Sequence, residues 1–115
     1  MLVVEDNPDS RDLLQLALEH FGYSVELCGD GNAAVEVATA RHPDAMLVDL
    51  GLPGRDGYEV ARAVREALGP AVRLVALTGY GQEDDRVRAL AAGFDAFLVK
   101  PADIDAIQEA LRRGN

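Results

Sequence analysis

The stretch Ala45-Met46-Leu47-Val48-Asp49 is a short, unbroken apolar run that ends in an aspartate, and it decides the fold class of this sequence. Four consecutive apolar residues are too few for a helix of ordinary length, and no polar residue marks a solvent-facing side. Such runs are typical of strands covered on both faces, as in a parallel sheet between two layers of helices. Asp49 then stands at the carboxyl end of a buried strand.

Four more short apolar runs lie on either side of this stretch, at residues 2–4, 25–28, 72–77 and 96–99, and they also predict strands. Between the runs lie longer segments in which apolar residues recur at helical spacing. We expect helices from Asn7-Pro8 to Gly22 and over residues 33–41, 58–68, 83–92 and 103–113. This alternation indicates an α/β fold with a parallel five-stranded sheet and helices on both faces.

The composition is that of one globular domain, which we expect to comprise residues 1–115. Apolar residues make up 49% of the chain, and the net charge of −9 argues against a nucleic-acid or anionic-membrane surface. No apolar run approaches the roughly 20 residues of a membrane span, and the first residues do not have the pattern of a signal peptide. Cys28, expected in the core, is the single cysteine, so no internal disulfide can form and a cytoplasmic location is favoured.

Ionisable and hydroxyl side chains follow four of the five predicted strands. These residues are Glu5 and Asp6 after the first strand, Asp49 after the third, Thr78 after the fourth and Lys100 after the fifth. In a parallel sheet the carboxyl ends of the strands share one edge, which is where such sheets bind ligands. We therefore expect three carboxylates, one hydroxyl and one ammonium group to meet there.

The chemistry of this set points to a metal and a phosphoryl group. Two carboxylates a few ångströms apart repel by about 4 kcal/mol at an effective dielectric constant near 20, so a cation is needed between them. Mg²⁺ suits a site with one or two carboxylates, waters and phosphate oxygens. Lys100 adds positive charge, Thr78 offers a hydrogen bond, and Asp49 can attack as a nucleophile.

These residues also carry a resemblance to a known family. The motifs, in chain order, are Glu5-Asp6-Asn7, Asp49 with Leu52-Pro53-Gly54 and Asp56-Gly57, Leu77-Thr78-Gly79, and Phe97-Leu98-Val99-Lys100-Pro101. Together they resemble the receiver domain of two-component response regulators over nearly the whole chain. The stretches at residues 76–81 and 92–95 look more like receivers of hybrid sensor histidine kinases. The resemblance implies a single three-layer (βα)5 flavodoxin-like domain with strand order 2-1-3-4-5.

The resemblance also implies a role for each site residue. Asp49 is the phosphoacceptor, and Thr78 and Lys100 contact the phosphoryl oxygens. Asp6, Asp49 and the backbone carbonyl of Gly51 bind Mg²⁺, and Glu5 completes the metal site by holding a metal-bound water. Phe97 is a switch residue that turns inward as Thr78 moves. The Lys100-Pro101 peptide bond is cis, which aims Lys100 into the site.

A protein of this kind is a signalling switch that catalyses its own phosphorylation and dephosphorylation and is not a turnover enzyme. Its phosphodonor is a histidine kinase, and its downstream partner is a protein that the sequence does not identify. We expect a monomer or a weak, phosphorylation-dependent dimer. Gly51 has no side chain with which to position or block an attacking water.

Two other functions fit parts of the pattern. A Mg²⁺-dependent phosphohydrolase with an aspartyl nucleophile is disfavoured, because similar enzymes carry a second aspartate where this chain has Gly51. A flavin-binding protein on the same fold needs a phosphate-binding loop after the first strand. Glu5 and Asp6 would repel that phosphate.

Overall fold

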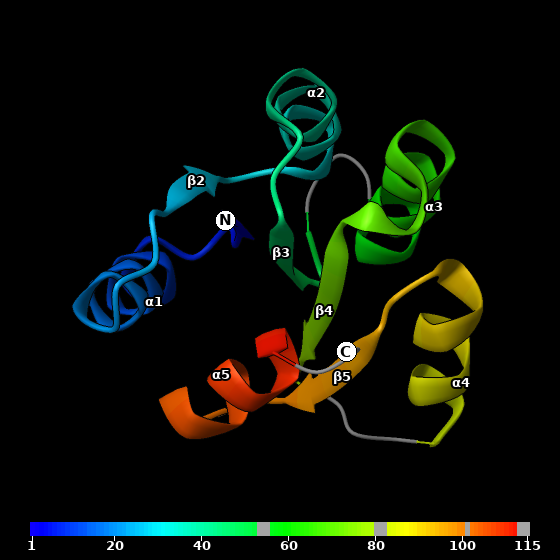
Figure 1. The fold of residues 1–115 in the computed structure, drawn as a ribbon. Coiled ribbons are helices and arrows are strands. Elements are labelled where there is room, and N and C mark those ends of the chain that lie inside the picture. The colour runs from blue at the N-terminus through cyan, green and yellow to red at the C-terminus, as the bar shows by residue number, and fades with distance from the viewer. Residues whose placement is uncertain (53–55, 80–82, 101, 113–115) are drawn as a thin grey trace.

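The chain forms a five-stranded parallel sheet in the order β2-β1-β3-β4-β5 (Figure 1). The computed structural model describes residues 1–52, 56–79, 83–100 and 102–112, with the side chains of 83–85 left aside. The strands are β1 (Leu2–Val4), β2 (Glu26–Cys28), β3 (Ala45–Asp49), β4 (Arg73–Thr78) and β5 (Ala96–Val99). The predicted fold class and strand order are confirmed.

Five helices cover the two faces of the sheet. They are α1 (Pro8–His20), α2 (Gly31–Arg41), α3 (Gly57–Leu68), α4 (Glu83–Ala92) and α5 (Ile104–Arg112), and a short 3-10 helix, η1 (Gly69–Ala71), follows α3. Helices α1 and α5 lie on one face, and α2, α3 and α4 lie on the other (Figure 1). Successive strand residues point to opposite faces, so Val48 packs toward α2 to α4 while its neighbour Leu47 packs toward α1 and α5.

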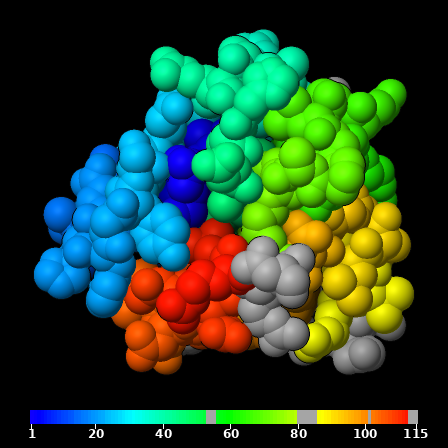
Figure 2. All heavy atoms as spheres, viewed as in Figure 1, coloured from blue at the N-terminus to red at the C-terminus, as the bar shows by residue number. Residues whose placement is uncertain are grey.

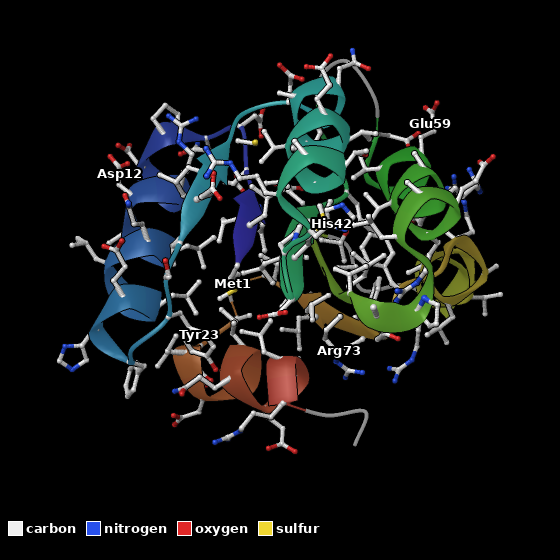
Figure 3. The ribbon with its side chains drawn as sticks, turned by 45° about the horizontal axis from the view of Figure 1, so that its top comes forward. Met1, Asp12, Tyr23, His42, Glu59 and Arg73 are labelled. Carbon is white, nitrogen blue, oxygen red and sulfur yellow. The ribbon has the colours of Figure 1, made fainter. Side chains whose placement is uncertain are left out.

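Both helical layers cover the sheet closely. In Figure 2 the start of the chain, in dark blue, is visible only in a gap between the surrounding segments. Met1 and Tyr23 pack against the α1/α5 core, whereas Asp12 and Glu59 point outward from α1 and α3 (Figure 3). None of the helices in the described ranges is long and apolar enough to cross a membrane.

Four side chains set the helix starts by capping. Asn7 Oδ1 accepts a hydrogen bond from the Ser10 N–H at 3.1 Å, and Asp30, Asp56 and Asp103 cap α2, α3 and α5 in the same way. The cap at Asp30 starts α2 at residue 31, two residues before the predicted start. Arg113, where the last helix was expected to end, lies outside the described residues.

Two features of burial do not follow from the apolar patterns of the sequence. Strand β5 is an edge strand and only partly covered, with Val99 exposed at its end, because no strand of the sheet lies beyond it. In α1 the helical periodicity is right, but Leu13 and Leu16 are each 67% exposed. The leucines of α1 that pack against the core are Leu14 and Leu18. Cys28 is buried, as predicted.

Candidate functional site

The register of the parallel strands brings the predicted site residues together at one edge of the sheet. Val4 pairs with Val48, so Glu5 and Asp49 are the next residues on neighbouring strands. The pairing continues past the strands, since the Leu50 N–H donates to the Leu77 carbonyl at 2.9 Å. On the other side of β4, the Lys100 N–H donates to the Thr78 carbonyl at 2.7 Å.

Three carboxylates form the centre of this edge. One oxygen each from Glu5, Asp6 and Asp49 lies within 4.8 Å of the other two. Glu5 is 1% exposed and Asp49 is 9% exposed, whereas Asp6 lies on the surface. The cluster therefore has a buried side and an open side, and a ligand would enter past Asp6.

Lys100 lies against the two buried carboxylates. Its Nζ is 2.6 Å from Asp49 Oδ2 and 3.0 Å from Glu5 Oε2. Burial acts to lower the pKa of Lys100, but the hydrogen bonds and charges of Asp49 and Glu5 outweigh it and hold that pKa above its usual value. Lys100 is thus a permanent cation beside Asp49.

The environment distinguishes Glu5 from Asp49. Burial raises the pKa of Glu5, and so do the hydrogen bond and the charge of Asp49, against the opposing effect of Lys100. Burial also acts to raise the pKa of Asp49, but hydrogen bonds with Glu5, Lys100 and the Gly51 N–H together lower it. The Gly51 N–H donates to Asp49 Oδ1 at 2.9 Å. Asp49 is therefore the carboxylate that stays ionised, as a nucleophile must.

The donor set fits a hard divalent cation. It consists of carboxylate oxygens with one open side, which is the arrangement that Mg²⁺ accepts while keeping several waters. Glu5 Oε1 also accepts a hydrogen bond from the Asn7 N–H at 3.2 Å, which fixes the buried carboxylate in place. The contact of Gly51 with Asp49 runs through its N–H, and the role of its carbonyl as a metal ligand stays a prediction.

The remaining predicted residues lie around this centre. Thr78 is buried at the end of β4, next to the strand that carries Asp49. Phe97 is partly buried and packs against the core on the α2 to α4 side. Pro101 lies outside the described residues, so the expected cis peptide bond stays a prediction.

Sequence reasoning missed three features of the site. The Asn7 and Gly51 N–H groups are backbone donors, and a pattern of side chains does not predict such contacts. A cavity of about 580 Å³ opens beside the site between α1 and α5, with Glu5 and Lys100 in its lining together with Leu13, Leu77 and Ile107. Of the two exposed leucines of α1 only Leu13 lines this cavity, and its helical spacing in the sequence gave no sign of the opening.

Comparison with known proteins gives a consistent family. The sequence matches the response regulator receiver domain family over residues 1–112. It is 33% identical over 111 residues to the sensor histidine kinase RcsC of Escherichia coli (strain K12), covering 96% of this chain and 12% of that protein. This chain thus corresponds to a small part of that relative.

Two solved structures share the fold closely. One is the receiver domain of the sensor histidine kinase PA1611 from Pseudomonas aeruginosa PAO1, which has a magnesium ion coordinated in its active site cleft. It has a TM-score of 0.89 at 38% identity and covers 97% of this chain and 93% of that one. The other, a response regulator from Burkholderia pseudomallei with a phosphorylated aspartic acid, calcium ion and citrate, has a TM-score of 0.90 at 32% identity, over 97% of this chain and 65% of that one.

The match of sequence over residues 1–112, the strand order and the likeness of both structures agree. The chain belongs to the response regulator receiver domain family.

Proposed function

We propose that this receiver domain takes a phosphoryl group from the phosphohistidine of a histidine kinase onto Asp49, in a reaction that requires Mg²⁺. Receiver domains act in phosphorelay signalling, and this chain is one. The observation that supports Asp49 is its buried, ionised carboxylate, held by Lys100 at 2.6 Å within a cluster of three carboxylates. The phosphorylated aspartic acid of the Burkholderia pseudomallei relative and the magnesium ion of the PA1611 receiver domain support the same chemistry.

In the proposed reaction an Asp49 oxygen attacks phosphorus and the phosphorus–nitrogen bond of phosphohistidine breaks. The electron pair leaves with the imidazole nitrogen, and Asp49 becomes an acyl phosphate. Glu5, Asp6, Asp49 and the Gly51 carbonyl would hold Mg²⁺, which would neutralise the phosphoryl oxygens when bound. Lys100 exchanges its contact with Asp49 for one with a phosphoryl oxygen, and Thr78 donates to another.

The phosphoryl group then changes the surface. Adding about two negative charges draws Thr78 and Lys100 inward, and Phe97 turns into the space that Thr78 leaves. This biases two packings of α4, β5 and α5, which a downstream protein distinguishes. The domain catalyses both the gain and the loss of its phosphate, and Gly51 has no side chain with which to position or block an attacking water.

The phosphodonor is proposed to dock on α1. Leu13 and Leu16 are exposed there, and the cavity between α1 and α5 leads from Leu13 to Glu5 and Lys100. An apolar surface beside a charged site suits a protein partner that carries a phosphohistidine. The proposed unit is one domain over residues 1–115, a monomer or weak phosphorylation-dependent dimer, and cytoplasmic, as the single buried thiol of Cys28 favours.

Incubation with acetyl phosphate and Mg²⁺, followed by intact mass measurement, tests this function. We expect one phosphate adduct, which is lost with EDTA and in Asp49→Asn. Asp44→Asn is the matched control, because Asp44 is an exposed aspartate just before β3. An adduct that persists in Asp49→Asn or without Mg²⁺ would contradict the proposal, and so would no adduct at all. Repeated turnover of a phosphoester would favour the phosphohydrolase instead.

A further inference from the structure

The start of α3 lies directly against the peptide that joins Asp49 to Leu50, and Gly57 is the point of contact. The Gly57 N–H donates to the Leu50 carbonyl at 3.1 Å. A methyl group placed on Gly57 would lie 2.7 Å from Leu50 Cα, 2.8 Å from Leu50 Cδ2 and 2.9 Å from the Asp49 carbonyl oxygen. Side chains in proteins do not approach backbone atoms this closely, so any residue other than glycine must move the start of α3 and the Asp49–Leu50 peptide apart.

Conformation does not explain the glycine. Gly57 is the first residue of α3, follows the cap Asp56, and is not among the residues with positive φ. Alanine has the higher helix propensity, so at an open helix start it would leave stability unchanged or raise it. The need for glycine at this position is therefore a need for space beside Asp49.

Leu50 is held from both sides by its backbone. Its N–H donates to the Leu77 carbonyl of β4, and its carbonyl accepts from Gly57 of α3. The residue is also buried. Because Leu50 is the only residue between Asp49 and Gly51, its position sets where the Gly51 N–H meets Asp49 Oδ1.

We propose that Gly57 is a positioning residue, which lets α3 approach closely enough to fix Leu50 and thereby orients the Asp49 carboxylate. This inference rests on the proposed role of Asp49 as phosphoacceptor. Gly57 itself contacts neither metal nor phosphoryl group. It acts through Leu50 on the hydrogen bond from the Gly51 N–H to Asp49 Oδ1, and so on the geometry of attack.

The variant Gly57→Ala tests this role. A displacement near 1 Å at a reacting group can cost about 100-fold in rate, so a shift of several tenths of an ångström should slow acetyl phosphate labelling by roughly tenfold. Mg²⁺ affinity, measured by calorimetry, should fall as well. The amide resonance of Gly51 should shift in the metal-free protein, which reports the hydrogen bond to Asp49 directly.

Ala67→Gly is the control, since Ala67 is exposed on α3 and the change weakens the helix without touching Asp49. It should lower stability and leave labelling rate, Mg²⁺ affinity and the Gly51 resonance unchanged. If Gly57→Ala does not fold, Leu50→Ala replaces it, because the buried Leu50 side chain packs beneath the start of α3. Its loss should lower the labelling rate and the Mg²⁺ affinity in the same way.

The outcomes separate this inference from the function on which it rests. A wild-type protein that takes no phosphate contradicts the role of Asp49, while the Gly51 resonance still reports on Gly57. The positioning role is overturned by a folded Gly57→Ala protein with an unshifted Gly51 resonance and wild-type Mg²⁺ affinity, or by a folded Leu50→Ala protein with wild-type labelling rate and Mg²⁺ affinity.

Discussion

Glu5 and Asp49 are neighbouring buried carboxylates that share the cation Lys100, yet they differ in proton affinity. Against the effect of burial, hydrogen bonds with Glu5, Lys100 and the Gly51 N–H lower the pKa of Asp49, whereas burial and the hydrogen bond and charge of Asp49 raise the pKa of Glu5. In the metal-free site the ionised form of Glu5 is therefore destabilised. A divalent cation would stabilise that form, because it binds the ionised carboxylates of both Glu5 and Asp49.

Replacing Glu5 with glutamine should have opposite effects on stability and metal binding. Because the folded state holds the Glu5 proton more tightly than the unfolded state, the free energy of unfolding falls as pH rises past 4.5 and through the raised pKa. Glu5→Gln removes this fall, so the variant should be the more stable protein at pH 7 in EDTA. Its Mg²⁺ affinity should drop. Urea unfolding with EDTA and with Mg²⁺ measures both, and a variant less stable than wild type in EDTA contradicts the argument.

Cys28 gives an independent test of burial. Burial raises the pKa of its thiol above 9.0, and the charges of Asp30 and Glu26 raise it further. The thiolate is the reactive form, so the native thiol should resist alkylation. We expect iodoacetamide at pH 8 to modify the native protein far more slowly than the urea-unfolded protein, as measured by intact mass. Equal rates would show that the end of β2 opens freely.

The site residues that act through a charged or hydroxyl side chain could be predicted from the sequence, and those that act through the backbone could not. Glu5, Asp49, Thr78 and Lys100 each follow an apolar run, and parallel strands bring such positions to one edge. The contact at Gly57 depends on how closely α3 approaches β3. The packing of whole elements sets that distance, and a local sequence pattern does not predict it.

At the scale of elements, two arginine side chains join α3 and α4 through contacts of different strength. Arg65 of α3 donates to the Gly93 carbonyl at 2.9 Å just beyond α4 and pairs with Asp95 at 2.6 Å. Further back on α4, the Arg88 guanidinium lies 4.2 Å from the centre of the Tyr58 ring. Arg65 therefore anchors the carboxyl end of α4 firmly, whereas the Arg88 contact, at an exposed residue, contributes about 0.5–1 kcal/mol.

Removing the two arginines should separate these contributions. Arg88→Gln should cost less than about 1 kcal/mol in stability while increasing amide hydrogen exchange within α4. Arg65→Gln should cost about 2 kcal/mol or more, because the Gly69 and Val72 carbonyls also lose a charged donor. Arg62→Gln, at an exposed site on α3, is the control. If exchange within α4 is the same in Arg88→Gln as in the control, Arg88 does not restrain the helix.

The boundaries of the elements could be predicted from the sequence, whereas the exposure of some of their side chains could not. The capping residues Asn7 and Asp56 mark helix starts that the sequence pattern located to within one residue. The exposed leucines of α1 could not be assigned to the surface from the sequence. Leucines recur around much of this helix, and helical spacing alone does not say which of them face the core. Only the sheet decides which side is covered.

At the scale of the whole molecule, the two apolar cores on opposite faces of the sheet meet at the acidic edge. Strand β3 contributes Met46 and Val48 to one core and Leu47 to the other, and Asp49 follows them. Both layers of helices therefore pack on the strand that carries the proposed phosphoacceptor. A ligand that binds at this edge should therefore stabilise the whole domain, which we expect to unfold in one cooperative transition.

Mg²⁺ should raise the melting temperature through this linkage. A ligand that binds only the folded state stabilises it by about 2.7 kcal/mol at 100 times its dissociation constant, and each kcal/mol raises the melting temperature by roughly 4 °C in a domain of this size. Sodium chloride at equal ionic strength is the first control, since salt screening of the net charge of −9 also stabilises. Asp49→Asn should lose the Mg²⁺ effect and Asp44→Asn should keep it. A Mg²⁺ effect no larger than that of sodium chloride would place the cation in the general ionic atmosphere instead of among Glu5, Asp6 and Asp49.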